Sequence, residues 1–140
     1  MPAVSLITVA VALAVATLLG VAWQRRNGRF SEVPMQGQPS PILSRLGWVE
    51  GTPLTLLQFS SAFCAPCRAA RVLCSQTAAA VPGVRHIEVD AESHLDAVRE
   101  LGILRTPTIL LISASGEIVR RASGLPTRSQ LLNAVGSAIG

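Results

Sequence analysis

The sequence contains no tyrosine and no lysine, and among its 140 residues it has only three phenylalanines, two tryptophans and eight carboxylate residues. The twelve basic residues are all arginine, and they occur singly or in pairs without interleaved aromatic side chains. A nucleic-acid-binding surface would need a longer basic run and aromatic side chains on which bases stack. The formal net charge of +4 therefore reflects a shortage of carboxylates, and we expect no nucleic-acid partner.

Charge is also absent near the N-terminus, where no charged residue occurs from Ala3 to Ala22. About 20 helical residues at ~1.5 Å rise each cover the ~30 Å hydrocarbon core of a bilayer, so this stretch predicts one transmembrane helix and a membrane anchor over residues 1–23. A cleaved signal peptide is the alternative, because Ala14-Val15-Ala16 could serve as a cleavage site. No basic residue precedes the apolar run, however, and the run continues beyond that site, which favours the anchor.

The residues after the apolar run indicate an orientation. Trp23 stands where an interfacial aromatic side chain is common, and Arg25, Arg26 and Arg29 come soon after it. No Lys or Arg precedes the helix, so the positive-inside rule predicts a single-pass membrane protein whose C-terminal domain is cytoplasmic. The extracytoplasmic face is the alternative.

The composition changes again at residues 24–41, which are rich in Gly, Pro and polar types. This composition predicts a juxtamembrane linker rather than packed structure. About a hundred residues then remain for one compact core. We therefore expect a single folded domain over residues 42–140, and a monomer.

Two strand–helix units are predicted in the first half of this domain. The apolar, β-prone run at residues 54–59 follows a Gly-Thr-Pro turn and predicts a buried strand, and apolar residues then recur at helical spacing over about residues 64–80. Residues 84–90 alternate in polarity and predict a second strand. A second helix is expected from about Ser93, with Gly102 as its stop.

Two strands and a helix complete the pattern. Residues 108–112 and 117–121 predict a β-hairpin around a turn at Ser115-Gly116. Thr127 with Gln130 is a capping-box signature that opens a last helix over residues 128–139. A β-α-β unit requires a parallel pair of strands and a hairpin requires an antiparallel pair. The sequence therefore predicts an α/β fold with a mixed central sheet flanked by helices on both faces.

The chemistry is concentrated in Cys64-Ala65-Pro66-Cys67, a C-x-x-C motif at the predicted strand-to-helix junction. Two intervening residues bring the sulfurs within disulfide reach, and Pro66 suits a first helical turn, where its missing N–H has no intrahelical partner to lose. Unpaired N–H groups and the positive end of the helix dipole favour the thiolate of Cys64, which makes it the expected nucleophile. Cys67, one turn deeper, is the expected resolving thiol that attacks the mixed disulfide.

Two metal ligands or two inert thiols are the alternative interpretation of this pair. A structural zinc site needs four ligands, typically a second C-x-x-C or a closely spaced His pair. Only Cys74, His86 and His94 remain, so no metal site is expected. Cys74 lies two helical turns after Cys67 and is expected to be a buried core cysteine, with a regulatory thiol as the alternative.

From about Leu54 to Ile139 the chain resembles the thioredoxin family. Four motifs carry the resemblance, and their order and spacing are specific together although each is weak alone. They are Phe63-Cys64-Ala65-Pro66-Cys67, which matches the family's aromatic-C-G-P-C active site, Val89-Asp90, which matches the end of its third strand, Thr106-Pro107-Thr108, which matches its cis-proline loop, and Gly116-Glu117 with Gly124, which matches its final hairpin.

The resemblance implies a thioredoxin-like fold and a protein-disulfide reductase that cycles between a Cys64–Cys67 disulfide and a dithiol, with no cofactor. It also implies that the Thr106–Pro107 bond is cis and faces the dithiol. The expected partners are protein disulfides and a reductase or membrane electron donor. The residues expected to contact the substrate are Phe63, Pro66, Thr106 and Pro107.

The segment between Cys67 and Pro107 is about as long as in a plain thioredoxin. It leaves no room for the inserted helical domain of the related disulfide oxidases, which favours a general reductase. Two other functions stay open: a non-catalytic redox-sensing or binding module at the membrane, and an extracytoplasmic thiol oxidase or isomerase, which requires the opposite topology.

Two of the departures from the family concern proton transfer. Gln58 stands where the resemblance implies a buried Asp that moves protons for the resolving cysteine, and a neutral amide cannot act as that base. His86 stands where the family carries a Lys near this Asp. One hypothesis is therefore that His86 supplies or tunes proton transfer beneath Cys67. A histidine that only packs or bonds locally is the alternative.

Overall fold

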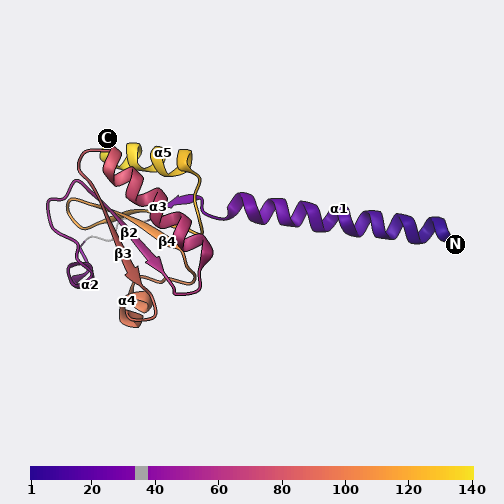
Figure 1. Cartoon of the computed structure of the whole chain (residues 1–140), viewed down its shortest axis with the longest axis horizontal. Helices are drawn as coiled ribbons and strands as arrows, with labels where there is room; N and C mark the ends of the chain where they lie inside the picture. The colour runs from indigo at the N-terminus through magenta and orange to yellow at the C-terminus, as the bar shows by residue number, and fades with distance from the viewer. Residues whose placement is uncertain (34–37) are drawn as a thin grey trace.

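The structure is a computed structural model that describes residues 1–33 and 38–140. A long N-terminal helix, α1 (Pro2–Arg26), extends away from an α/β domain formed by the rest of the chain (Figure 1). No residue of α1 is buried, and by length and composition the helix could cross a membrane. A signal sequence would meet the same two criteria, so α1 is a candidate span.

The domain is built on one five-stranded sheet with the order β1-β5-β4-β2-β3. Strands β2 and β3 are parallel, and the other neighbouring pairs are antiparallel, which confirms the mixed sheet that the sequence predicted. The strands are β1 (Phe30–Glu32), β2 (Leu54–Ser60), β3 (Val84–Asp90), β4 (Thr108–Ser113) and β5 (Ile118–Ser123).

Helices cover both faces of this sheet, as predicted (Figure 1). On one face α2 (Pro41–Arg45) and α4 (Leu95–Glu100) pack over apolar side chains that include Phe59 of β2. On the other face α3 (Ala65–Ala80) and α5 (Arg128–Ile139) pack over a second cluster that includes Leu56. All seven residues of β2 are buried, because a central strand with helices on both sides has no exposed face.

The predicted element order is correct from Leu54 onward, and the predicted boundaries need small corrections. The last helix covers the predicted residues and opens with the expected capping box of Thr127 and Gln130. The helix expected from about Ser93 begins only at Leu95, because the Ser93 hydroxyl donates to the carboxylate of Asp90 and so caps a loop instead. The hairpin strands are each one or two residues longer than predicted at their C-terminal ends.

Part of the segment predicted as a linker over residues 24–41 forms regular structure. Helix α1 continues through Arg26, and β1 then pairs antiparallel with β5 at the edge of the sheet, with Phe30 opposite Ala122. A three-residue edge strand has no periodicity of its own to detect, since its hydrogen bonds come from a partner some 90 positions away. Residues 34–37, which the linker prediction includes, lie outside the described residues.

Candidate active site

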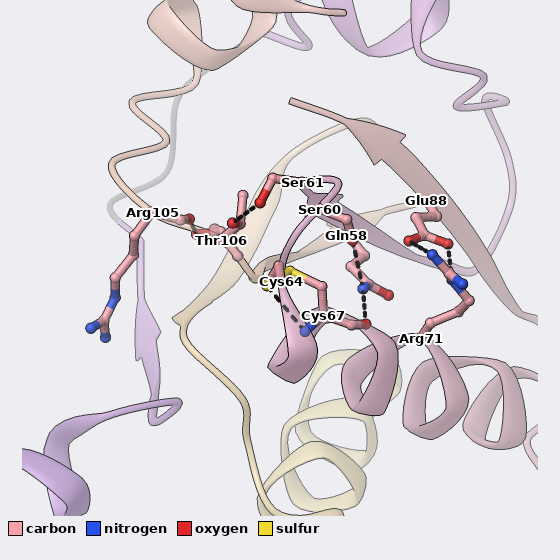
Figure 2. The surroundings of a disulfide bond; sticks show 10 residues. Gln58, Ser60, Ser61, Cys64, Cys67, Arg71, Glu88, Arg105 and Thr106 are labelled. Atoms are coloured by element: carbon pink, nitrogen blue, oxygen red, sulfur yellow. Dashed lines mark hydrogen bonds and ion pairs between the residues drawn. A yellow bond between two sulfur atoms is a disulfide. The ribbon is translucent and has the colours of Figure 1, made fainter. Parts of the chain in front are cut away.

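The two cysteines of the C-x-x-C motif lie where β2 gives way to α3 (Figure 2). Cys64 is the N-cap residue of α3 and is half-buried, whereas only 1% of Cys67 is exposed. A disulfide joins their sulfur atoms, with 5.2 Å between the Cα atoms. The backbone N–H of Cys67 donates to the Sγ of Cys64 across 3.2 Å.

The N-terminal end of α3 gives these two sulfurs different surroundings. Pro66 occupies the first turn, where its lack of an N–H costs no helical hydrogen bond. The Cys64 sulfur lies at the positive end of the helix dipole and accepts from a backbone N–H, which favours a negative charge on it once the disulfide is open. The Cys67 sulfur is enclosed, so an incoming partner meets Cys64 first.

The loop before β4 lies beside the disulfide. The Thr106–Pro107 bond is cis, as the resemblance implied, and Pro107 is buried. The hydroxyls of Ser61 and Thr106 are 2.8 Å apart, so a hydrogen bond ties this loop to the one that carries Cys64 (Figure 2).

Two apolar side chains near this site are fully exposed. Phe63, directly before Cys64, has a relative exposure of 102%, and Leu104, two residues before Thr106, has 96%. Phe63 was predicted from the sequence and Leu104 was not, because Leu104 follows Ile103 and reads as part of the same apolar pair. Pro66 is also exposed, so three of the residues around Cys64 offer apolar surface to a partner.

Beneath the disulfide, Gln58 makes a buried polar bridge. Its side-chain nitrogen donates to the Ser60 hydroxyl and to the backbone carbonyl of Cys67, both at 2.9 Å. A carbonyl oxygen can only accept, so the amide nitrogen must face Cys67 and the amide oxygen must face the other way. That oxygen lies 3.0 Å from the Nε2 of His86, which therefore carries the hydrogen.

The other ring nitrogen of His86, Nδ1, lies 3.2 Å from the Ser75 hydroxyl, which donates to it when the ring is neutral. Burial lowers the pKa of His86, and the nearby Arg71 guanidinium lowers it further, whereas Glu88 opposes them by raising it. The structure thus brings His86 and Gln58 together beneath Cys67, but the connection ends on the Cys67 carbonyl rather than on its sulfur.

Glu88 and Arg71 form a partly exposed ion pair beside this polar cluster, and neither was predicted from the sequence as a site residue. The Nη2 of Arg71 donates to Glu88 Oε1 across 2.8 Å (Figure 2). The hydrogen bond from Arg71 is the main reason that the pKa of Glu88 is lowered, and Ser60 also donates to this carboxylate. In the register of β2 and β3, Glu88 lies opposite Gln58, and it follows His86 by two residues. These two relationships were the signal that could have identified Glu88.

Cys74 is a buried core cysteine, as predicted. It lies on the same face of α3 as Cys67 and packs in the cluster beneath α3 and α5. Burial raises the pKa of the Cys74 thiol to about 12, with a smaller contribution from the negative charge of Glu88. A thiol in these surroundings is uncharged and inert.

Within residues 1–33 and 38–140, His, Cys, Asp and Glu side chains form no group of three that could hold a metal ion. The cysteine pair, the cis-proline loop and the polar cluster beneath them lie together at this end of the domain.

Comparisons with known proteins agree with this geometry. The family model of thioredoxin matches residues 49–137. A single-residue variant of thioredoxin from Halobacterium salinarum NRC-1 superposes with a TM-score of 0.62 at 20% identity, over 74% of this chain and 88% of that one. Mitochondrial thioredoxin 3 of Saccharomyces cerevisiae, in its oxidized form, gives 0.59 at 18% identity, over 69% and 89% of the two chains.

Thioredoxin f from spinach chloroplast also gives 0.59, at 23% identity, over 71% of this chain and 85% of that one. At such identities the structural likeness shows the fold. No curated protein matches the sequence significantly. The family model covers well over half of the sequence and includes the cysteine pair and the cis-proline loop, and the chain therefore belongs to the thioredoxin family.

Proposed function

We propose that this protein is a membrane-anchored protein-disulfide reductase that acts through Cys64 and Cys67. The observation that carries the proposal is the asymmetry of the pair: one sulfur lies at a helix N-terminus with an N–H directed at it, and the other is buried one turn deeper. Thiol–disulfide exchange needs this division between an attacking and a resolving group.

The reaction runs in two exchanges. The Cys64 thiolate attacks one sulfur of a substrate disulfide, a mixed disulfide forms, and the other substrate sulfur leaves as a thiolate that takes up a proton. Cys67 then loses its proton and attacks the Cys64 sulfur. The Cys64–Cys67 disulfide forms and the second substrate thiol is released, so two electrons have passed to the substrate.

Substrate binding is assigned to the surface around Cys64. Phe63 and Pro66 offer exposed apolar contacts on one side, and Thr106 lies on the other side, next to the cis bond to Pro107. The hydrogen bond between Ser61 and Thr106 holds the two sides together. An extended chain with a disulfide at its centre fits between two such loops.

The proposal includes a compartment and an electron donor, and the candidate anchor supports both. Helix α1 suits a single span, and the arginines after Trp23 favour a cytoplasmic domain. A cytoplasmic domain would be recharged by a reductase or by a membrane electron carrier that returns two electrons to the disulfide. A membrane-impermeant thiol reagent applied to intact cells tests this side assignment, since it should not label Cys64.

The test of the function is reduction of insulin by the full chain in detergent micelles, with dithiothreitol as the electron source. The wild type should accelerate reduction well above the dithiothreitol background, and Cys64→Ser should return it to background while the circular dichroism spectrum is unchanged. Cys74→Ala is the matched control, because it removes a buried thiol outside the proposed site and should keep the activity.

A wild-type protein that does not accelerate insulin reduction would contradict a general reductase. The alternative, a non-catalytic binding or redox-sensing module, predicts that a partner is still captured when both Cys64 and Cys67 are replaced by serine. Capture that requires the two thiols supports the reductase.

A further inference from the structure

A pocket of about 610 Å³ lies between the end of α1 and the start of α3. From the anchor side it is lined by Gln24, Arg25, Asn27 and Arg29, and from the domain side by Pro66 of the C-x-x-C motif and Leu125. We call this pocket the anchor-side groove. Pro66, one of the two residues between the cysteines, thus shares one surface with the end of the candidate membrane span.

The end of α1 is fixed against the domain rather than loosely attached. Only residues 27–29 separate α1 from β1, and β1 is hydrogen-bonded to β5. The Gly28 N–H donates to the Ser123 carbonyl across 2.8 Å, and a Cβ on Gly28 would lie 2.0 Å from the carbonyl oxygen of Leu125. The chain therefore leaves the anchor in close contact with the segment after β5.

Because α1 is fixed against the domain, the attachment determines how far the anchor-side groove lies from the surface of a membrane that α1 spans. Arg26 is four residues past Ala22, so it lies about 6 Å beyond the apolar stretch along the helix axis. Arg25 therefore stands at the level of the lipid headgroups when α1 spans the bilayer, and Arg29 follows three residues after the helix ends. The groove and the adjacent Cys64 are held close to the membrane surface, where the bilayer would obstruct a large soluble protein.

The charge of the groove selects among segments that can reach it. Arg25 and Arg29 are two of its lining residues, and among the described residues that line it none is acidic. An acidic segment would gain from these two guanidinium groups, whereas a basic one would be repelled. Polar amide side chains from Gln24, Asn27 and Gln130 offer hydrogen bonds to an extended backbone.

We propose that the anchor-side groove receives an extended, acidic juxtamembrane segment of another membrane protein, and that the disulfide in this segment is the physiological substrate. The inference rests on the proposed reductase function and adds its substrate class. The exchange is the one given above: Cys64 and Cys67 supply the two electrons, and the partner's disulfide becomes two thiols. A dithiol donor restores the pair.

The experiment places the full chain in phosphatidylcholine vesicles with one of two reporter proteins, each with a single span. Both reporters carry the same glutamate-flanked disulfide loop on the same side as the domain. In one the loop follows the span directly, and in the other a long flexible linker separates the two. We expect the juxtamembrane loop to be reduced at least about tenfold faster, because the fixed anchor raises its effective concentration at Cys64.

Equal rates for the two reporters, with insulin still reduced, would overturn this inference and leave the proposed function standing. Failure to reduce insulin as well would overturn both. A flexible Gly/Ser insertion between Arg26 and Asn27 supplies a second measurement, since it should remove the preference for the juxtamembrane loop. A preference that survives the insertion also contradicts a role for the fixed anchor.

Charge variants test the occupant of the groove. Arg25→Glu together with Arg29→Glu should slow reduction of the glutamate-flanked loop and speed reduction of a matched lysine-flanked loop. Arg26→Glu is the control, because Arg26 belongs to the same helix end but does not line the groove. If the Arg26 control changes the two reduction rates as much as the double variant does, the rates depend on net charge near the membrane and not on the groove. That result would contradict the proposal.

Discussion

The Nε2–H of His86 donates to the side-chain oxygen of Gln58 across 3.0 Å. The side-chain nitrogen of Gln58 in turn donates to the Cys67 carbonyl. Two successive hydrogen bonds therefore connect His86 with the helix that carries the C-x-x-C motif. In that path the neutral amide takes the position where the family carries an acid. The titratable side chain of this path is that of His86, which lies on the neighbouring strand β3.

The first prediction concerns stability and follows from the lowered pKa of His86. Above its ordinary pKa of 6.5 the ring is neutral in both the folded and the unfolded chain. Below 6.5 the unfolded chain takes up a proton that the folded chain resists, so the free energy of unfolding falls as the pH falls through this region. His86→Gln, which cannot titrate, should lose this part of the pH dependence in urea titrations at a series of pH values.

The comparison of wild type and His86→Gln should cover the range below 6.5 and down to about 5, before the carboxylates begin to titrate. His94→Gln is a control on the opposite face of the sheet. If the wild type and His86→Gln lose stability in parallel over this range, His86 does not resist protonation.

The second prediction concerns proton transfer by the same residue. If His86 tunes the ionisation of Cys67 through Gln58, His86→Ala should shift the pH profile of insulin reduction. Gln58→Leu should give a shift in the same sense, because it cuts the path to Cys67 at the next step. An unchanged profile in His86→Ala would leave the histidine as a local hydrogen-bonding group only.

The third prediction concerns the ion pair between Arg71 and Glu88. Arg71 lowers the pKa of Glu88, so the pair stabilises the fold at neutral pH and its contribution is lost as the pH falls below 4.5, the ordinary pKa of a glutamate. Because both side chains are partly exposed, Glu88→Gln should lower the free energy of unfolding by at most about 1 kcal/mol at pH 7. Asp96→Asn is the control, since it breaks a more exposed pair with Arg45 and should cost less.

The fourth prediction concerns the remaining cysteine. With a pKa of about 12, Cys74 has only about one part in ten thousand of thiolate at pH 8, and its thiol is also enclosed. In the reduced, folded protein, iodoacetamide should modify Cys64 and leave Cys74 unmodified, as read by peptide mass spectrometry. After unfolding in urea all three cysteines should react. Labelling of folded Cys74 at the rate of an exposed thiol would contradict its placement in the core.

The fifth prediction concerns Gly28, which lies where α1 is attached to the domain. Gly28 has φ of 73° and no room for a Cβ against the Leu125 carbonyl oxygen. Gly28→Ala should therefore destabilise the attachment by roughly 1–3 kcal/mol and speed hydrogen exchange at the amides of β1. Gly51→Ala is the matched control, because Gly51 has φ of 83° with open space around it and carries the backbone strain without the clash. Equal effects on β1 would contradict the close contact.

Local sequence was sufficient wherever the stabilising contacts are local. The capping box of Thr127 and Gln130 spans three positions, and α5 begins and ends as predicted. The hydrogen bond from the Cys67 N–H to the Cys64 sulfur also spans three positions, and the C-x-x-C spacing alone indicates it. The second helix was misplaced by two residues because Ser93 bonds to Asp90 before it rather than capping the turn after it.

Contacts between residues that are far apart in the sequence could not be predicted from the local sequence pattern. The bond between Ser61 and Thr106 joins residues 45 positions apart, and the bond between His86 and Gln58 joins residues 28 apart. The resemblance pointed to His86, but the end of the path on the Cys67 carbonyl is visible only in the structure. Glu88 was missed because its role depends on which strand lies beside β3 and in which register.

By itself the sequence determined a β-α-β and β-hairpin order, an apolar N-terminal helix and a cysteine pair at a helix start, because periodicity, capping and motif spacing are properties of neighbouring residues. Only the tertiary structure decided that residues 30–32 complete the sheet and that the end of α1 lies beside Pro66. Those arrangements depend on hydrogen bonds and packing between segments brought together by the closed fold, and no short window of residues contains both partners.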